Sequence, residues 1–153
     1  MSMSANDSYR ELMRYLHRAA LLNDRIGERL FTSRIGVGRS MFLVLHTIAE
    51  AGKGGVVAQQ WIADQLSLTK GAVSRHVATA ERAGWLRIEP SPVSRRENAL
   101  VLTPSGRKLL ARGRALQRDL DGLSDEVLDA ADVAATVRTL RAICDILEKQ
   151  ERQ

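Results

Sequence analysis

The segment between Gln59 and Gly106 constrains the fold more than any other part of the chain. Residues 59–66 place apolar side chains on one side of a short helix, and a two-residue turn follows. Thr69 is a favourable N-cap for a second helix, which we expect to run to Ala83 and to stop at Gly84. Two extended segments, 85–89 and 98–102, then flank a loop that carries arginines. The predicted order is helix, turn, helix, strand, loop, strand.

The predicted helix 69–83 divides into an apolar and a polar side. Its inward positions are Ala72, Val73, Val77 and Ala80, and its outward positions are Lys70, Ser74, Arg75, Thr79 and Arg82. A helix with short polar groups and a few cations on its outer face can lie in the major groove of DNA, where arginine bridges two acceptors of guanine. Gly71 removes side-chain bulk from the first turn, so the helix N-terminus can approach a phosphate closely. This layout is that of a winged helix-turn-helix, and it indicates recognition rather than catalysis.

The loop between the two predicted strands carries a pair of arginines next to prolines. The prolines stiffen a segment that makes no backbone hydrogen bonds to a neighbouring strand. Arginines on such an arm suit the narrow minor groove and its negative potential. The candidate DNA-binding residues are therefore Thr69, Lys70, Gly71, Ser74, Arg75, His76, Thr79, Arg82, Arg95 and Arg96.

The charge distribution agrees with a phosphate-binding face in the middle of the chain. The net charge is +5, but residues 67–118 hold 11 basic and 3 acidic side chains, whereas the remainder holds 12 basic and 15 acidic ones. A basic centre between mildly acidic flanks is typical of a nucleic-acid-binding protein. Solvated helices can carry a similar excess, so the charge supports the motif and does not replace it.

The flanking sequence predicts four further helices, at 8–31, 39–51, 103–119 and 124–151, with a short extended piece at Val56 and Val57. Thr103 and Pro104 fit the start of the third of these helices, and Ser124 with two acidic residues fits the start of the last. The first helix carries an apolar stripe that includes Leu12 and Leu16 and is broader than one packing partner needs, and the last helix carries a stripe that includes Val137, Leu140 and Leu147. The predicted fold class is mainly α with a small antiparallel β wing, built on a winged helix-turn-helix.

Composition excludes several classes of protein. No apolar run approaches the roughly 20 residues that cross a bilayer, and no secretory signal begins the chain, so we expect a cytoplasmic protein without membrane contact. The single cysteine, Cys144, fits a reducing compartment, and its place in an apolar stripe predicts a buried thiol. His17, His46 and His76 lack the spacing of a metal site; we expect His46 in the core and His76 near DNA. No catalytic motif is apparent, and we expect neither an enzyme nor a cofactor.

The segments IADQLSLTKGAVSRHVATAERAGWL (62–86) and SRRENALVLTPSGRKLL (94–110) resemble the MarR family of transcriptional regulators, over nearly the whole chain. The resemblance implies a homodimer with a helical dimerisation layer, in which residues 8–38 and 104–151 form the dimerisation region and residues 39–103 the winged helix-turn-helix. The dimer interface is then expected at Leu12, Leu16, Val137, Leu140 and Leu147. It implies a repressor that binds a palindromic operator in double-stranded DNA and is released by a small aromatic or phenolic effector, held between the dimer layer and the DNA-binding lobe. By the same resemblance, Arg96 corresponds to the arginine at the tip of the wing. The chain departs from the family pattern at Ser94, usually Asp, and at Ala58, usually the Thr or Ser cap of the helix 59–66.

Two alternative functions remain open from the sequence. A winged helix can serve as a protein-interaction module with an incidental basic face, or Cys144 can make the regulator redox-responsive. The cluster of Arg75, Arg82, Arg95 and Arg96 favours DNA binding over the first alternative. The redox-responsive alternative is disfavoured because relatives that sense peroxide carry their cysteine in the first helix, where this chain has no cysteine.

Overall fold

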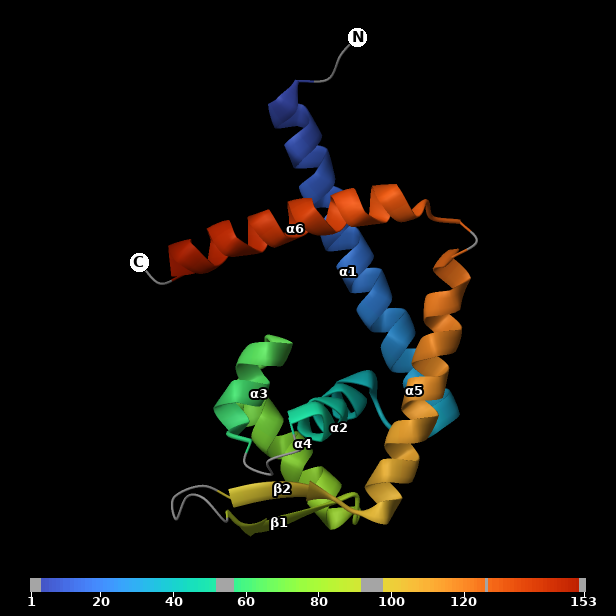
Figure 1. Cartoon of the computed structure of the whole chain (residues 1–153), viewed down its shortest axis with the longest axis vertical. Helices are drawn as coiled ribbons and strands as arrows, with labels where there is room; N and C mark the ends of the chain where they lie inside the picture. The colour runs from blue at the N-terminus through green and yellow to red at the C-terminus, as the bar shows by residue number, and fades with distance from the viewer. Residues whose placement is uncertain (1–3, 52–56, 92–97, 126, 152–153) are drawn as a thin grey trace. The chain divides into compact units, whose positions relative to one another are not determined.

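The computed structural model describes residues 4–51, 57–91, 98–125 and 127–151 (Figure 1). Its elements, in chain order, are α1 (Ala5–Ile35), α2 (Arg39–Ala51), α3 (Gln59–Leu66), α4 (Lys70–Arg82), β1 (Leu86–Pro90), β2 (Asn98–Leu102), α5 (Pro104–Asp125) and α6 (Ala130–Glu151). The predicted fold class, mainly helical with a small antiparallel sheet, is confirmed. The chain divides into two parts, residues 1–114 and 115–153, and each is described by itself.

Helix α1 is longer at both ends than the predicted helix 8–31. The Ser4 side chain accepts a hydrogen bond from the backbone N–H of Asp7 at 3.2 Å, which caps the first turn. At the other end Gly36 adopts a left-handed conformation with φ of 87°, and its N–H bonds back to the carbonyls of Phe31 and Thr32. The glycine supplies a conformation that a side chain would resist.

Helix α2 forms the centre of the core, with the bounds that the sequence predicted. It buries Met41, Phe42, Val44, Leu45 and Ile48. The Phe42 ring lies 4.7 Å, centroid to centroid, from the ring of Phe31 on α1 and also packs against α5 at Gly113, where an added methyl group would collide with it. His46, predicted to lie in the core, is half-buried with its ring 5.7 Å from that of Phe42.

Helices α3 and α4 are joined by a turn with defined hydrogen bonds. Ser67 adopts a left-handed conformation with φ of 51°, and the N–H of Leu68 bonds to the carbonyl of Ala63 at 2.9 Å. Thr69 caps α4 as predicted, because its hydroxyl accepts from the N–H of Ala72 at 3.1 Å. Ala58 provides no side-chain bond to the start of α3, in agreement with its departure from the family pattern.

The two strands form an antiparallel pair whose register runs from Leu86 opposite Leu102 to Pro90 opposite Asn98. Strand β2 has its predicted bounds, and β1 is displaced by one residue from the predicted 85–89. Val57 is buried and belongs to no strand, whereas Val56, the other half of the predicted extended piece, lies outside the described residues.

Helix α5 is attached to the end of the sheet by Thr103. Its hydroxyl accepts from the N–H of Gly106 at 3.0 Å and donates to the carbonyl of Gly84 at 2.6 Å, while its own N–H bonds to the carbonyl of Trp85. A methyl group on Gly106 would overlap that Trp85 carbonyl, so only glycine permits this approach. The start of α5 is thereby fixed to the residues that follow α4.

The predicted start of the last helix at Ser124 is wrong. Ser124 lies in the last turn of α5, which continues past the predicted end at 119, and α6 begins at Ala130. The cap comes instead from Asp129, whose carboxylate accepts from the N–H groups of Ala131 at 2.8 Å and Asp132 at 3.1 Å.

The expectation of a buried thiol is also wrong. Cys144 is exposed, while its neighbour Ile143 is the buried residue of α6. The apolar stripe on α6 is real, but within the single chain most of it faces solvent, including Val137 and Leu147, which are 41% and 54% exposed.

Candidate nucleic-acid interface and adjoining pocket

The exposed side of α4 is the candidate interface, and the core fixes its orientation. Val73, Val77 and Ala80 are buried against the neighbouring elements, so helical geometry directs the opposite side outward. All seven predicted contact positions on that side are exposed: Thr69, Lys70, Gly71, Ser74, Arg75, Thr79 and Arg82. His76 differs, because it is half-buried at the edge of this surface.

The two arginines of α4 lie in different surroundings. Arg82 folds back on its own helix, with Nε 3.4 Å from the carbonyl of Ala78 and a guanidinium nitrogen 3.4 Å from the Thr79 hydroxyl. Arg75 extends toward the first turn, where a methyl group at Gly71 would lie 3.7 Å from its guanidinium. Both guanidinium groups can bind phosphate oxygens or the paired acceptors of guanine.

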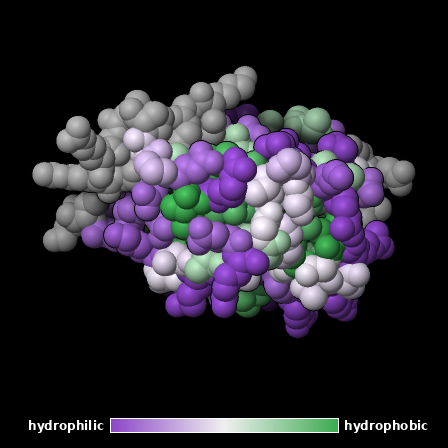
Figure 2. Space-filling view, turned by 90° about the horizontal axis from the view of Figure 1, so that it is seen from below, coloured by the Kyte–Doolittle hydropathy of each residue, from purple (hydrophilic) through white to green (hydrophobic). Residues whose placement is uncertain are grey.

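The surface at the wing end of the molecule is rimmed by hydrophilic side chains, with apolar ones visible in small patches (Figure 2). Lys70 also borders a pocket of about 260 Å³ at the start of α3, which Ile88, Asn98 and Leu100 of the sheet help to line. Arg95 and Arg96, the predicted wing arginines, lie outside the described residues, as does Ser94.

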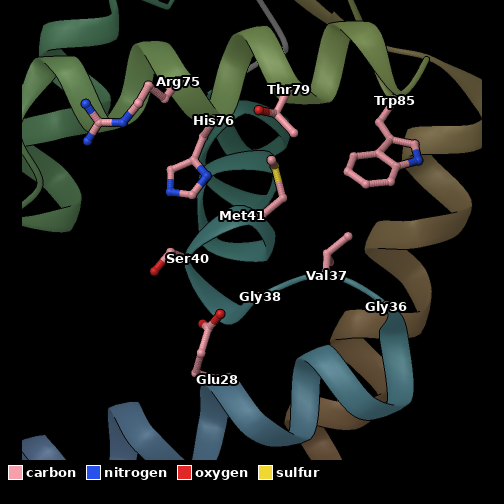
Figure 3. A pocket seen from close by; sticks show the side chains of 10 residues that line it. All are labelled: Glu28, Gly36, Val37, Gly38, Ser40, Met41, Arg75, His76, Thr79 and Trp85. Carbon is pink, nitrogen blue, oxygen red and sulfur yellow. The ribbon is translucent and has the colours of Figure 1, made fainter.

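A larger pocket of about 540 Å³ lies between α1, α2 and α4 (Figure 3). It is lined by Glu28, Gly36, Val37, Gly38, Ser40, Met41, Arg75, His76, Thr79 and Trp85. The polar side chains of Glu28, Ser40, Arg75 and His76 lie toward one end, and Val37 and Trp85 lie toward the other, with Met41 between them. The pocket is thus amphipathic along its length.

The carboxylate of Glu28 is engaged by the start of α2. It accepts a hydrogen bond from the backbone N–H of Arg39 at 2.8 Å, and a methyl group on Gly38 would collide with it. The Arg39 side chain in turn pairs with Asp24 at 3.2 Å. These contacts join α1 to α2, and a carboxylate is well placed there because a helix N-terminus carries partial positive charge.

His76 faces the polar end of the pocket and has an altered proton affinity. Burial lowers its pKa from the ordinary value of 6.5, the neighbouring Arg75 lowers it further, and Glu28 opposes both effects. The imidazole is therefore neutral at neutral pH, so it offers one N–H donor and one acceptor.

The predicted dimer residues lie on both parts of the chain. Leu12, Leu16 and Leu140 are half-buried, whereas Val137 and Leu147 are exposed. Among the described residues, every exposed large apolar side chain except Trp61 belongs to α1 or to the segment 127–147. Exposed apolar area is thus concentrated on the elements that the sequence assigned to dimerisation.

The resemblance implied an effector between the dimer layer and the DNA-binding lobe, but the residues that line this pocket were not predicted. Its residues come from α1, the α1–α2 connection, α2 and α4, and no spacing along the chain links Glu28 to Arg75 or Trp85. In the parts of the chain that the structure describes, no group of three or more His, Cys, Asp or Glu side chains could hold a metal ion. None of the described helices is both long enough and apolar enough to span a membrane.

The fold and the exposed α4 surface define a winged helix-turn-helix protein: α3, the turn and α4 form the helix-turn-helix, and β1 with β2 forms the wing. Residues 35–97 match the family model of the MarR family. The resemblance drawn from the sequence is therefore confirmed over these residues.

Solved structures share the fold over nearly the full length. A MarR/EmrR family regulator from Acinetobacter sp. ADP1 has a TM-score of 0.81 at 19% identity, covering 92% of this chain and 96% of that one. A MarR variant from E. coli, complexed with operator DNA, has a TM-score of 0.74 at 22% identity, with coverage of 92% and 99%. CouR from Rhodococcus jostii RHA1, bound to p-coumaroyl-CoA, has a TM-score of 0.76 at 20% identity, with coverage of 93% and 95%. No curated protein matches the chain.

The lowered pKa of His76 predicts a specific dependence of stability on pH. Because the folded state disfavours the protonated imidazole, its contribution to stability is complete above pH 6.5 and decreases as the pH falls through that value, until the folded state is protonated as well. An NMR titration of the imidazole, assigned with His76→Gln, should give a midpoint below 6.5. A midpoint at or above that value would contradict the described surroundings of His76.

Proposed function

We propose that this protein is a homodimeric, sequence-specific transcriptional regulator that represses its target by binding a palindromic operator, and that a small ligand releases it. It acts in the cytoplasm as a DNA-binding protein without an enzymatic step. Residues 39–103 form the DNA-binding region, and residues 8–38 and 104–151 form the dimerisation region.

The observation that carries the proposal is the one-sided burial of α4. Val73, Val77 and Ala80 on its apolar side are buried, while the opposite side presents three cations and three hydroxyl groups to solvent, counting the Thr69 cap. The fixed orientation of α4 matters because a helix that contacts base edges must be held rigidly. Packing of its apolar side against the core provides this rigidity. The E. coli neighbour complexed with operator DNA supports the same use of the fold.

Dimerisation is supported by the exposed apolar side chains of α1 and α6. Tyr9, Tyr15, Leu21 and Ile26 on α1, and Val133, Val137, Ile146 and Leu147 on α6, are all more than two-fifths exposed. A concentration of this kind indicates a protein interface. A two-fold dimer would present two α4 helices, which matches a palindrome with half-sites about one helical turn apart.

A small-molecule effector is supported by the pocket between α1, α2 and α4, whose volume falls within the range of ligand sites. The neighbour bound to p-coumaroyl-CoA has the same fold and holds an organic ligand. The aromatic or phenolic character implied by the family resemblance suits the end of the pocket near Trp85 and Met41.

We predict that Arg75→Ala and Arg96→Ala each weaken operator binding, by about 1–3 kcal/mol where the lost contact is to a base. Both variants lose one positive charge at the proposed interface. Gel-shift titration at constant salt concentration measures the effect, since phosphate contacts make affinity depend on salt.

Arg138→Ala is the matched control, because Arg138 is an exposed arginine of α6 outside the basic segment 67–118 and its loss changes the net charge equally. It should retain the affinity of the unaltered protein. Full affinity of an Arg75→Ala, Arg96→Ala double variant would refute this assignment of the interface.

We predict that Leu16→Asp and Leu140→Asp each dissociate the dimer, because each places an unpaired carboxylate in a dry helical interface. Ala134→Asp is the control: it adds the same charge to α6 on the side that carries Arg138, Arg141 and Asp145. Sedimentation velocity should show monomers for the leucine variants and dimers for the control. Intact dimers for both leucine variants would contradict the proposed interface.

A further inference from the structure

The basic segment 67–118 holds more cations than the proposed DNA contacts use. Five of its eleven Lys and Arg side chains are assigned to α4 and to the wing. Two more form ion pairs, Arg87 with Glu89 at 3.0 Å and Arg114 with Glu50. The recognition helix and the wing do not account for the four that remain. All four are exposed residues of α5: Arg107, Lys108, Arg112 and Arg118.

Two of these cations stand at the unfavourable end of α5. The helix begins at Pro104, so Arg107 lies in its first turn and Lys108 directly follows. A helix N-terminus carries partial positive charge and is stabilised by acidic side chains, of which the first turn of α5 has none. Arg107 and Lys108 therefore oppose the stability of α5 where it begins. Proteins break such local rules mainly at functional sites.

Backbone carbonyl groups hold the two guanidinium groups on either side of Lys108. Arg107 donates to the carbonyl of Leu102 at 2.6 Å, and Arg112 donates to the carbonyl of Arg34 at 3.0 Å. Among the residues that the structure describes, no acidic side chain forms an ion pair with Arg107, Lys108 or Arg112. Because a guanidinium has five N–H donors, each arginine retains donors for an external anion. A side chain already held in place also loses less conformational entropy when it binds.

The start of α5 adjoins the helix-turn-helix. The Thr103 hydroxyl donates to the carbonyl of Gly84 at 2.6 Å, so the first turn of α5 is fixed beside the end of α4. Figure 1 shows α5 beginning next to the sheet formed by β1 and β2. Arg107, Lys108 and Arg112, together called the α5 cation cluster, thus belong to the lobe that is proposed to bind DNA.

We infer that the α5 cation cluster is a second DNA contact, which binds phosphate groups of the backbone and reads no base. The inference rests on the proposed function, because it takes duplex DNA as the partner. Each arginine can bind two phosphate oxygens at once through its planar fork. Phosphate contacts of this kind fix the orientation of a protein on the duplex and add affinity without adding sequence information. DNA is favoured over an acidic protein because the cluster adjoins the other exposed cations of the same lobe.

A charge-neutralising variant of the full-length protein tests the inference. Arg107→Gln with Lys108→Gln removes two charges, and the glutamine at position 107 keeps an N–H donor for the Leu102 carbonyl. Thermal unfolding should show this variant to be at least as stable as the unaltered protein, because cations leave the positive end of α5. Lys108→Gln alone leaves both arginines in place and should give a smaller effect on DNA of the same kind.

The matched control is Arg138→Gln with Arg141→Gln, which removes two charges from exposed positions of α6. Binding is measured by fluorescence anisotropy at several salt concentrations, with two labelled duplexes of equal length. One is a palindrome that the protein selects from random sequences, and the other is an unrelated sequence. The control should bind both duplexes as the unaltered protein does.

The cluster variant should bind both duplexes more weakly by the same factor, because phosphate contacts carry no sequence information. The slope of log affinity against log salt concentration should decrease in magnitude by about 3–4, since a dimer loses four contacts at about 0.9 each. Arg75→Ala should differ from the cluster variant by reducing the preference for the selected palindrome.

An unchanged affinity and salt slope in the cluster variant would overturn the inference and favour an acidic protein as the partner. A loss confined to the palindrome, or an equal loss in the α6 control, would overturn it as well. The proposed function stands in each of these cases, provided that the protein still prefers the palindrome. If the protein binds duplexes without any preference, the proposed function fails, while a reduced salt slope in the cluster variant still supports the cluster. Absence of binding to either duplex would refute both.

Discussion

One-sided burial of α4 is the constraint on which the proposed interface depends. Val73, Val77 and Ala80 fill the core beside α2 and α3, and helical geometry then fixes where every polar residue of α4 points. The Thr69 cap and the Ser67 turn set the start of the helix. Arg75 and Arg82 occupy an exposed surface because their positions on the helix permit nothing else. The exposure of the cations on α4 therefore follows from the packing of its apolar side as much as from its composition.

The same lobe is joined to the flanking helices by close backbone and ring contacts. Gly106 lets α5 approach the carbonyl of Trp85, and Gly113 lets the Phe42 ring lie against α5. On the other side, Glu28 and Asp24 of α1 bind the start of α2 through Arg39. Trp85 and Glu28 also line the pocket that Arg75 enters. A ligand in that pocket would therefore touch residues that join the flanking helices to this lobe as well as the arginine on the surface of α4.

The sequence predicted those elements whose limits are set by local chemistry. The bounds of α2, α3 and β2 and the Thr69 cap follow from apolar periodicity and cap preference. The start of α6 was missed because Ser124 and Asp129 both suit a helix N-terminus, and only the structure shows that α5 continues through Ser124. The exposure of Cys144 and the pocket depend on tertiary packing, which no local pattern reports.

Chemical footprinting tests the recognition role of α4 most directly, with the protein bound to a palindromic DNA duplex that it selects from random sequences. The account predicts protection of guanine N7 in the major groove at two positions related by two-fold symmetry and separated by about one helical turn, roughly 10 base pairs. It predicts that the protection at one guanine of each half-site disappears in Arg75→Ala while the outer limits of the footprint remain. Protection confined to the phosphate backbone, with no guanine affected by that substitution, would contradict sequence recognition by α4.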